Sequence, residues 1–192
     1  MSKLTTTDDV VLGSGDMFIC DTATEKFNDL EIGKKAFYEA LEVEDYQIGH
    51  IQGGASLEYT SEWKKVKDDY KVIVKQFLTN EEVKLKGGIL AWNASVLETL
   101  CATARVTEDN ENHIKLVKIG GTQNTNGKKY FIHFRHKRDD GTYIRVTIVG
   151  VCENGFTLAF DPEKETVLDP VFSAQAGDSE GTLVYYSEQK KA

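Results

Sequence analysis

The chain has 192 residues, of which 40% are hydrophobic and 28% charged, and 31 Asp and Glu against 23 Lys and Arg give a formal net charge of −8. This composition is typical of a globular protein, and the length suits one domain with arms or long loops. No window approaches the roughly 18 apolar residues of a membrane span, and the first nine residues lack the apolar run of a secretory signal. We therefore expect a protein made in a cytoplasm, with no membrane insertion.

The charge is distributed unevenly along the chain. Residues 1–45 carry 11 acidic and 4 basic residues, residues 46–138 carry 10 and 15, and residues 139–192 carry 10 and 4, which gives −7, +5 and −6. Tight nucleic-acid binding depends on Lys and Arg that neutralise phosphates, so the acidic total argues against it. The pattern fits either compensation inside one chain or copies that meet basic surface to acidic surface.

The first 45 residues have little regular patterning. Ala36 and Phe37 precede Ala40 and Leu41 by four residues, which is helical spacing, but the flanking segments are polar. We expect residues 1–45 to form mainly an extended, partly ordered N-terminal arm. The main domain is expected over residues 46–188, with a frayed C-terminus at residues 189–192.

Alternation of apolar and polar residues predicts strands in the middle of the chain. Residues 70–75 alternate, and Val83 and Leu85 alternate with lysines over residues 83–86. Asn80-Glu81-Glu82 lies between these segments and predicts a polar turn that joins the two strands. The adjacent glycines at 53 and 54 are expected to bend the backbone into an earlier strand over residues 55–59.

One helix is predicted after residue 94. Ser95 and Glu98 have the spacing of a capping box, in which the hydroxyl and the carboxylate each accept from a backbone N–H of the first turn. The apolar residues that follow form one stripe able to lie on a sheet; they are Val96, Leu97, Leu100, Cys101 and Ala104. Cys101 is accordingly expected in the core.

Glycine-containing turns divide the second half of the chain. Asn126-Gly127 is the strongest short hairpin signal, and Asp139-Asp140-Gly141 and Glu153-Asn154-Gly155 repeat it. The strands expected between these turns are residues 114–119, 130–135, 142–149 and 156–160. Together they predict an antiparallel meander.

Few spacings bring catalytic or metal-binding side chains together. His133 and His136 are three apart in a predicted strand, which places them on opposite faces and argues against a shared metal. The three cysteines are odd in number and far apart, which suits neither a disulfide framework nor a metal knuckle. His50 is near glycines, but no phosphate-binding, nucleophile-elbow, HExxH or calcium-loop motif is present. We expect a non-enzymatic protein with no catalytic residue, no cofactor and no metal.

Basic residues are interleaved with aromatic residues in two runs, one before residue 76 and one around residues 128–138. Such mixtures can bind single-stranded nucleic acid, but Asp68 and Asp69 interrupt the first run and Asp139 and Asp140 the second. A solvated or subunit-facing surface is therefore favoured. The candidate inter-subunit contacts are Trp63, Lys64, Lys65, Lys67, Tyr70, Lys71 and Lys75.

Several segments together resemble the major tail tube proteins of tailed bacteriophages. They are residues 48–59 (IGHIQGGASLEY), 63–69 (WKKVKDD), 72–77 (VIVKQF), 79–85 (TNEEVKL), Trp92 with the helix after it, 156–161 (FTLAFD), 172–174 (FSA) and 177–183 (GDSEGTL). The resemblance covers roughly residues 46–188 and lies in the order of elements, since no catalytic signature is shared. Residues 1–45 match less well.

The resemblance implies a fold and a function. The fold would be mainly β, an antiparallel β-sandwich or barrel with one flanking α-helix, and the segment at about residues 63–86 would be a long hairpin that reaches the next ring. Six copies would form a ring, and stacked rings would form the tail tube of the virion, through which viral DNA passes without sequence-specific binding. The implied partners are other copies, the tape measure protein, the tail terminator and baseplate or tail-tip proteins. Contractile tails and related particles share this architecture, so the particle type stays open.

Two other classes of function remain open. One is another phage assembly component, such as a tail terminator, head decoration or tube-tip protein, which would stop at one ring or sit on a capsid. The other is a monomeric β-barrel that binds a small ligand or uses His50, His133 or a carboxylate in catalysis. An apolar pocket with convergent polar groups and a perturbed pKa would identify this last class.

Overall fold

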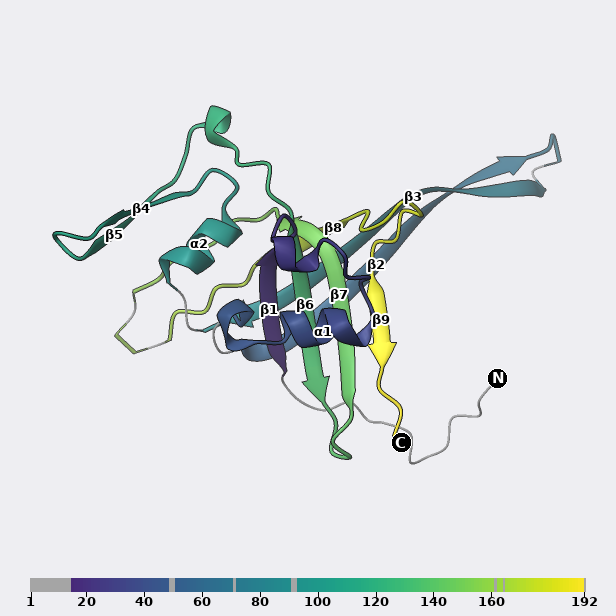
Figure 1. Ribbon diagram of the computed structural model, residues 1–192. Helices are drawn as coiled ribbons and strands as arrows, with labels where there is room; N and C mark the ends of the chain where they lie inside the picture. Colours follow the sequence, from purple (N-terminus) through teal and green to yellow (C-terminus); the bar gives the residue numbers. More distant parts are fainter. Residues whose placement is uncertain are drawn as a thin grey trace.

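A computed structural model (Figure 1) describes residues 15–48, 51–70, 72–90, 93–160, 162–163 and 165–191. The described chain is mainly β, with antiparallel strand pairs throughout. The strands are β1 (Asp16–Asp21), β2 (Ile51–Lys67), β3 (Ile73–Ile89), β4 (Arg105–Asp109), β5 (Ile114–Lys118), β6 (Tyr130–Lys137), β7 (Tyr143–Cys152), β8 (Val171–Gln175) and β9 (Tyr185–Glu188). The α-helices are α1 (Lys35–Leu41) and α2 (Ala94–Leu100), and short 3-10 helices span Glu25–Phe27, Glu44–Tyr46 and Thr122–Asn124.

Seven strands form one sheet. Its order is β1-β6-β7-β8-β3-β2, and β9 pairs with β7 outside that path, while β4 and β5 form a separate two-stranded sheet. The strand β7 has β6 on one edge and two partners on the other. Its residues Ile144 to Thr147 pair with β9, and its residues Val149 to Cys152 pair with β8. The sheet therefore divides at β7, and β8 continues it toward the long β3–β2 pair.

The part of the sheet made by β1, β6 and β7 is covered on both faces. Alternation along β6 sends Ile132 into a cluster with Met17 and Ile148 and sends Phe131 into a second cluster with Phe18 and Phe37. The first cluster continues through β3 and α2, where Leu85 and Leu100 are buried. The second lies between the sheet and α1. Burial on both faces makes these three strands the best-packed part of the described chain.

Residues 15–48 do not form the expected arm. The strand β1 pairs with β6 over its whole length, and α1 lies across the sheet (Figure 1). The helix presents Phe37, Tyr38, Ala40 and Leu41, all buried, which is the spacing of an amphipathic helix. The helical spacing at residues 36–41 was thus correct, and the flanking polar residues occupy turns and short 3-10 helices. Residues 1–14 lie outside the described residues.

The long hairpin is present, but its turn differs from the prediction. Asn80, Glu81 and Glu82 lie inside β3, where they pair with Glu62, Ser61 and Thr60 of β2. The chain reverses at residues 68–72, where Asp68 Oδ1 accepts hydrogen bonds from the backbone N–H groups of Tyr70 and Val72, at 3.0 and 2.8 Å. A polar tripeptide can continue a strand when both faces are exposed, because no core selects against it.

The start of α2 also differs. Asn93 is its N-cap residue, and the Asn93 side chain accepts from the backbone N–H groups of Ser95 and Val96 at 2.9 and 3.1 Å. Ser95 therefore lies inside the first turn and forms no capping box, and Glu98 instead lies 3.7 Å from the Lys128 ammonium. Asparagine caps a helix as well as serine does, so Asn93, two residues before Ser95, can take the N-cap position.

The meander is confirmed in part. Asp139-Asp140-Gly141 joins β6 and β7 as expected, and Gly141 has a positive φ of 85°. Asn126-Gly127 does not connect two paired strands. The strand before it, β5, pairs instead with β4, which the sequence analysis did not predict. Residues 156–160 form no strand either; the strands after β7 are β8 and β9.

The remaining expectations concern helices and cysteines. Within the described residues, no helix is long and apolar enough to cross a membrane, since α1 and α2 have seven residues each. All three cysteines are free. Cys20 is buried, whereas Cys101, expected in the core, is only half-buried, as is Cys152.

Candidate assembly interface

The β2–β3 hairpin is the most exposed element of the described chain. It extends away from the rest of the molecule as a long two-stranded ribbon (Figure 1). The described side chains from Ser56 to Tyr70 and from Val72 to Glu81 are all exposed. Because both faces of this ribbon lack a covering layer, its strands are held only by each other, and an isolated two-stranded hairpin is marginally stable in water.

Large hydrophobic side chains gather on this hairpin. Of the fourteen such side chains that are exposed among the described residues, nine belong to it: Leu57, Tyr59, Trp63, Val66, Tyr70, Val72, Ile73, Phe77 and Leu78. Exposed apolar surface on this scale marks interaction sites in soluble proteins. In addition, β2 ends the sheet order, so none of the described strands pairs with its outer edge. An open strand edge is a template for pairing with another chain.

The predicted contact residues lie together on this hairpin. Trp63, Lys64, Lys65 and Lys67 come from β2, Lys75 comes from β3, and Tyr70 lies in the turn with 89% of its surface exposed. Lys71 lies outside the described residues. The described members of this set therefore share one structural element.

The pairing register divides the hairpin tip into two faces. Trp63 pairs with Leu78 and Lys65 with Gln76, while Lys64, between them in the strand, pairs with Phe77. Successive side chains of a strand point to opposite faces, so Trp63 and Lys65 share one face and Lys64 lies on the other. On the Lys64 face, the Lys75 ammonium lies 4.7 Å from the centroid of the Phe77 ring.

A second cluster of charged residues lies beneath α1 and is built entirely within the chain. Glu42, just after α1, accepts hydrogen bonds from Arg135 of β6, at 2.9 Å, and from Arg145 of β7. Arg135 also donates to Asp16 of β1 at 2.7 Å. The Arg145 guanidinium stacks 4.8 Å from the Tyr38 ring centroid. These contacts fasten the N-terminal layer to the three central strands.

The same cluster contains a chain of hydrogen bonds that resembles a catalytic arrangement. Thr147 Oγ1 lies 2.8 Å from His133 Nδ1, and His133 Nε2 lies 3.2 Å from Glu42 Oε1. Since the carboxylate can only accept, His133 donates from Nε2, and the Thr147 hydroxyl donates to Nδ1. His133 and Thr147 have no exposed surface. A substrate therefore has no access to the hydroxyl in this structure, and the chain serves to connect layers.

Burial and hydrogen bonding set the protonation states in this cluster. Burial alone would raise the pKa of Glu42, but hydrogen bonds from His133, Arg145 and Arg135 outweigh it and lower that pKa to about 2. Burial lowers the pKa of His133 more than Glu42 raises it. The cluster thus holds an ionised Glu42 between two arginines and a neutral His133. Sequence analysis missed it because its members lie far apart in the chain; Asp16 and Arg135, for example, are separated by 119 residues.

Among the described residues, no group of three or more His, Cys, Asp and Glu is placed to hold a metal ion. His133 and His136, expected on opposite faces, are both buried. His133 faces the Glu42 cluster through its contacts with Glu42 and Thr147. His50 lies outside the described residues.

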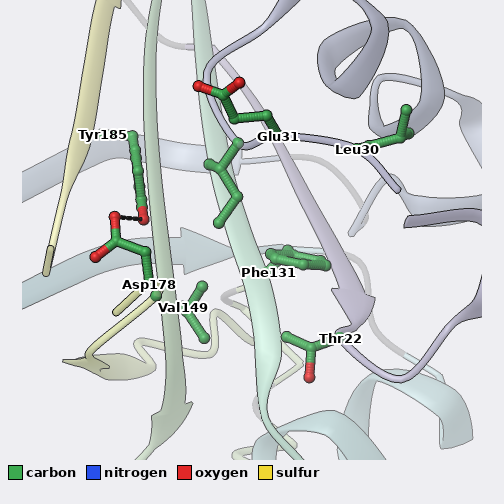
Figure 2. Close-up of a pocket in the computed structure, with 9 residues that line it drawn as sticks. Thr22, Leu30, Glu31, Phe131, Val149, Asp178 and Tyr185 are labelled. Atoms are coloured by element: carbon green, nitrogen blue, oxygen red, sulfur yellow. Dashed lines mark hydrogen bonds between the residues drawn. The ribbon is translucent and has the colours of Figure 1, made fainter. Parts of the chain in front are cut away.

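A groove of about 440 Å³ opens between the loop before α1 and the segment before β9 (Figure 2). Its floor is formed by Phe131 and Val149, and Leu30 and Ile32 add apolar surface. Tyr185 donates a hydrogen bond to Asp178 at 2.7 Å on one side. Glu31 lies on the other side, as Figure 2 shows.

Asp178 is a fixed negative charge in this groove. Its Oδ1 accepts from the backbone N–H groups of Glu180 and Thr182, both at 3.0 Å, and its Oδ2 accepts from Tyr185. These hydrogen bonds lower the pKa of Asp178 well below its usual range. Burial and the Asp178 carboxylate raise the pKa of Tyr185 to about 12. Both oxygens of Asp178 are therefore occupied by its own loop.

No protein-family model matches the chain, and no curated protein is significantly similar to it. Its function is therefore inferred from its geometry together with the resemblance of residues 46–188.

Proposed function

We propose that the chain is the tail tube subunit of a bacteriophage or a related phage-tail-like particle. In this proposal six copies form a ring around a central channel, stacked rings make the tube, and the tube carries viral DNA into the host cell. The fold of each copy is an antiparallel sandwich or barrel that closes only when neighbouring copies supply strands. The protein acts by polymerising and has no catalytic role.

The β2–β3 hairpin is the observation that carries this proposal. It holds nine of the exposed large hydrophobic side chains and leaves the outer edge of β2 without a partner among the described strands. A chain that remained a monomer would gain little stability from the exposed part of these two 17-residue strands, because burial supplies most of the stability of a strand pair. A closed ring of copies removes open strand edges, and a second ring offers a surface for the tip.

The acidic net charge suits a conduit for DNA. Since affinity for DNA depends on basic residues that release counterions, a net charge of −8 gives a surface to which DNA adheres weakly. Rapid passage requires this weak adhesion.

The ligand-binding alternative receives less support. The groove at Phe131 does combine an apolar floor with groups of shifted pKa, Asp178 and Tyr185. Both groups are, however, engaged with each other and with the loop backbone. A small ligand would find few polar groups free to orient it.

Electron microscopy tests the proposal directly. Purified protein, concentrated and stained, is expected to form rings or tubes, whereas a strictly monomeric protein under all conditions, even with tail components added, would overturn it. A single ring that never stacks would favour the terminator or decoration class.

A truncated hairpin sharpens this test. Residues 62–80 are replaced by Asn-Gly, which joins Ser61 to Glu81, a pair already in register. This variant keeps Val83 and Leu85 in the core, so we expect it to fold and to lose stacking. Tubes that form as readily as with the full hairpin would contradict the assigned role of the tip.

A further inference from the structure

The two acidic ends of the sequence meet at one place in the fold. Glu31 belongs to the acidic segment 1–45 and Asp178 to the acidic segment 139–192, and both line the groove above Phe131 and Val149. Asp29 and Glu180, each two positions away along the chain, are exposed as well. The described residues that line the groove include no Lys, Arg or His. The groove is therefore apolar at its floor and acidic around it.

The basic hairpin has the complementary character. On one face of its tip, Trp63 is 53% exposed and is followed on the same face by Lys65. The indole Nε1 donates to Ser61 of its own strand at 3.2 Å, which leaves the remaining ring atoms free for apolar contact. Aromatic residues that fill pockets, with charged residues beside them, are typical of the few positions that dominate binding energy.

We propose that the groove at Phe131 receives the hairpin tip of a second copy of this chain. Trp63 of the incoming hairpin packs on Phe131 and Val149, and Lys65 lies among the carboxylates of Glu31 and Asp178. The inference rests on the proposed function, because it names the surface on which the tip docks between subunits.

The two carboxylates act differently in this contact. Asp178 is fixed by its loop, so it presents a preorganised negative charge that costs no ordering when the lysine arrives. Glu31 is exposed and is paired at 3.4 Å with the exposed Lys34, a contact that water weakens. Glu31 can therefore exchange Lys34 for the incoming Lys65.

Charge reversal on each side tests the docking. Lys65→Glu and Glu31→Lys, made separately in the full-length chain, are each expected to raise the protein concentration needed for tube formation about tenfold, because like charges then face each other. The double variant, with both changes in every copy, is expected to regain tubes at close to the original concentration. Light scattering measures assembly, and circular dichroism checks that each variant folds.

Matched controls separate this contact from a general charge effect. Lys118→Glu makes the same change on the exposed strand β5, and Glu111→Lys reverses an acidic charge in the turn between β4 and β5, so both are expected to assemble normally. If Lys118→Glu impairs assembly as much as Lys65→Glu, the effect is a general one of charge and the assigned contact is wrong. If both singles impair assembly and the double variant is not restored, the pairing of Lys65 with Glu31 is wrong.

Cross-linking gives an independent readout. A photoreactive benzoylphenylalanine in place of Trp63 is expected to link to Leu30, Ile32 or Tyr185 of another copy, identified in tubes mixed from ¹⁴N- and ¹⁵N-labelled protein. Links confined to other surfaces would overturn the groove assignment and leave the tube proposal intact. Unmodified protein that forms no assembly would instead overturn the tube proposal itself.

Discussion

Two regions of the molecule use the same kinds of residue in opposite ways. Beneath α1, phenylalanines 18, 37 and 131 are buried, and two arginines are held by Glu42 and Asp16. On the β2–β3 hairpin, aromatic residues and lysines are exposed on both faces. The first region receives its covering layer from residues 15–48 of the same chain. The second has none among the described residues, and the proposed function assigns that covering layer to another copy of the chain.

The two largest expected effects test the covered region. Glu42→Ala leaves the half-buried Arg135 and Arg145 without their shared carboxylate. Removing one partner of a buried ion pair typically costs about 3–5 kcal/mol, and because Arg135 keeps Asp16 the lower end of that range applies. We expect a loss of that order in the free energy of unfolding, measured by urea denaturation. Glu39→Ala, in the same helix but exposed and paired only with Lys35, is the control and is expected to change stability little. Equal effects for the two variants would show that the cluster does not hold the N-terminal layer.

Two phenylalanines compare the regions directly. Phe37 has no exposed surface, and its truncation to alanine is expected to cost about 3–5 kcal/mol of unfolding free energy. Phe77 is 43% exposed on the hairpin, and Phe77→Ala is expected to change the stability of the monomer by less than about 0.5 kcal/mol. If Phe77→Ala destabilises the monomer like Phe37→Ala, the hairpin is packed within its own chain and the comparison fails.

Acid is expected to weaken the covered region. Glu42 has its pKa lowered from 4.5 to about 2, so its contribution, roughly 3 kcal/mol, is complete above pH 4.5 and is lost as the pH falls toward 2. The lowered pKa of His133 acts in the same direction, because the folded state favours neutral imidazole and loses stability as the pH drops below about 6.5. Unfolding free energy should therefore decline from pH 7 downward.

The hairpin-truncated variant provides the control for this pH profile. Since it retains Glu42 and His133, it should lose stability on acidification in parallel with the full chain. Glu42→Gln should flatten the decline below pH 4.5. An unchanged profile in Glu42→Gln would mean that other carboxylates control acid unfolding.

The sequence predicted local features better than long-range ones. Glycine-containing turns predicted the strands at residues 130–135 and 142–149 and the turn at Gly141 between them, because each signal lies within a few neighbours. Alternation could not locate the turn at Asp68, since an exposed ribbon imposes no core pattern on either face. The strand β9 has only four residues and pairs with a segment of β7 that is distant in the sequence, so it carries little local signal.

The candidate interface and the cluster around Glu42 also differ in how far apart their residues lie in the sequence. The interface residues lie close in sequence, so a run of lysines and aromatics was enough to find them. Glu42, His133 and Arg145 come from separate elements, and their polar character predicted an exposed arm for the first of them. Arg135 and Arg145 lie opposite each other beneath α1 only because β6 pairs with β7. An ionic cluster cannot be predicted from local sequence patterns when only the arrangement of distant strands and helices brings its residues together.

The smallest expected effect concerns the boundary of the covered region, at the start of α2. Asn93 accepts hydrogen bonds from the backbone N–H groups of Ser95 and Val96, and replacing such a cap by alanine typically costs about 1 kcal/mol. The Ser95 side chain has no capping role, so Ser95→Ala is expected to change stability by less than about 0.5 kcal/mol. Thermal and urea unfolding of the two variants distinguishes them. A larger loss for Ser95→Ala would restore the capping box predicted from the sequence and would place the first residue of the helix two positions later.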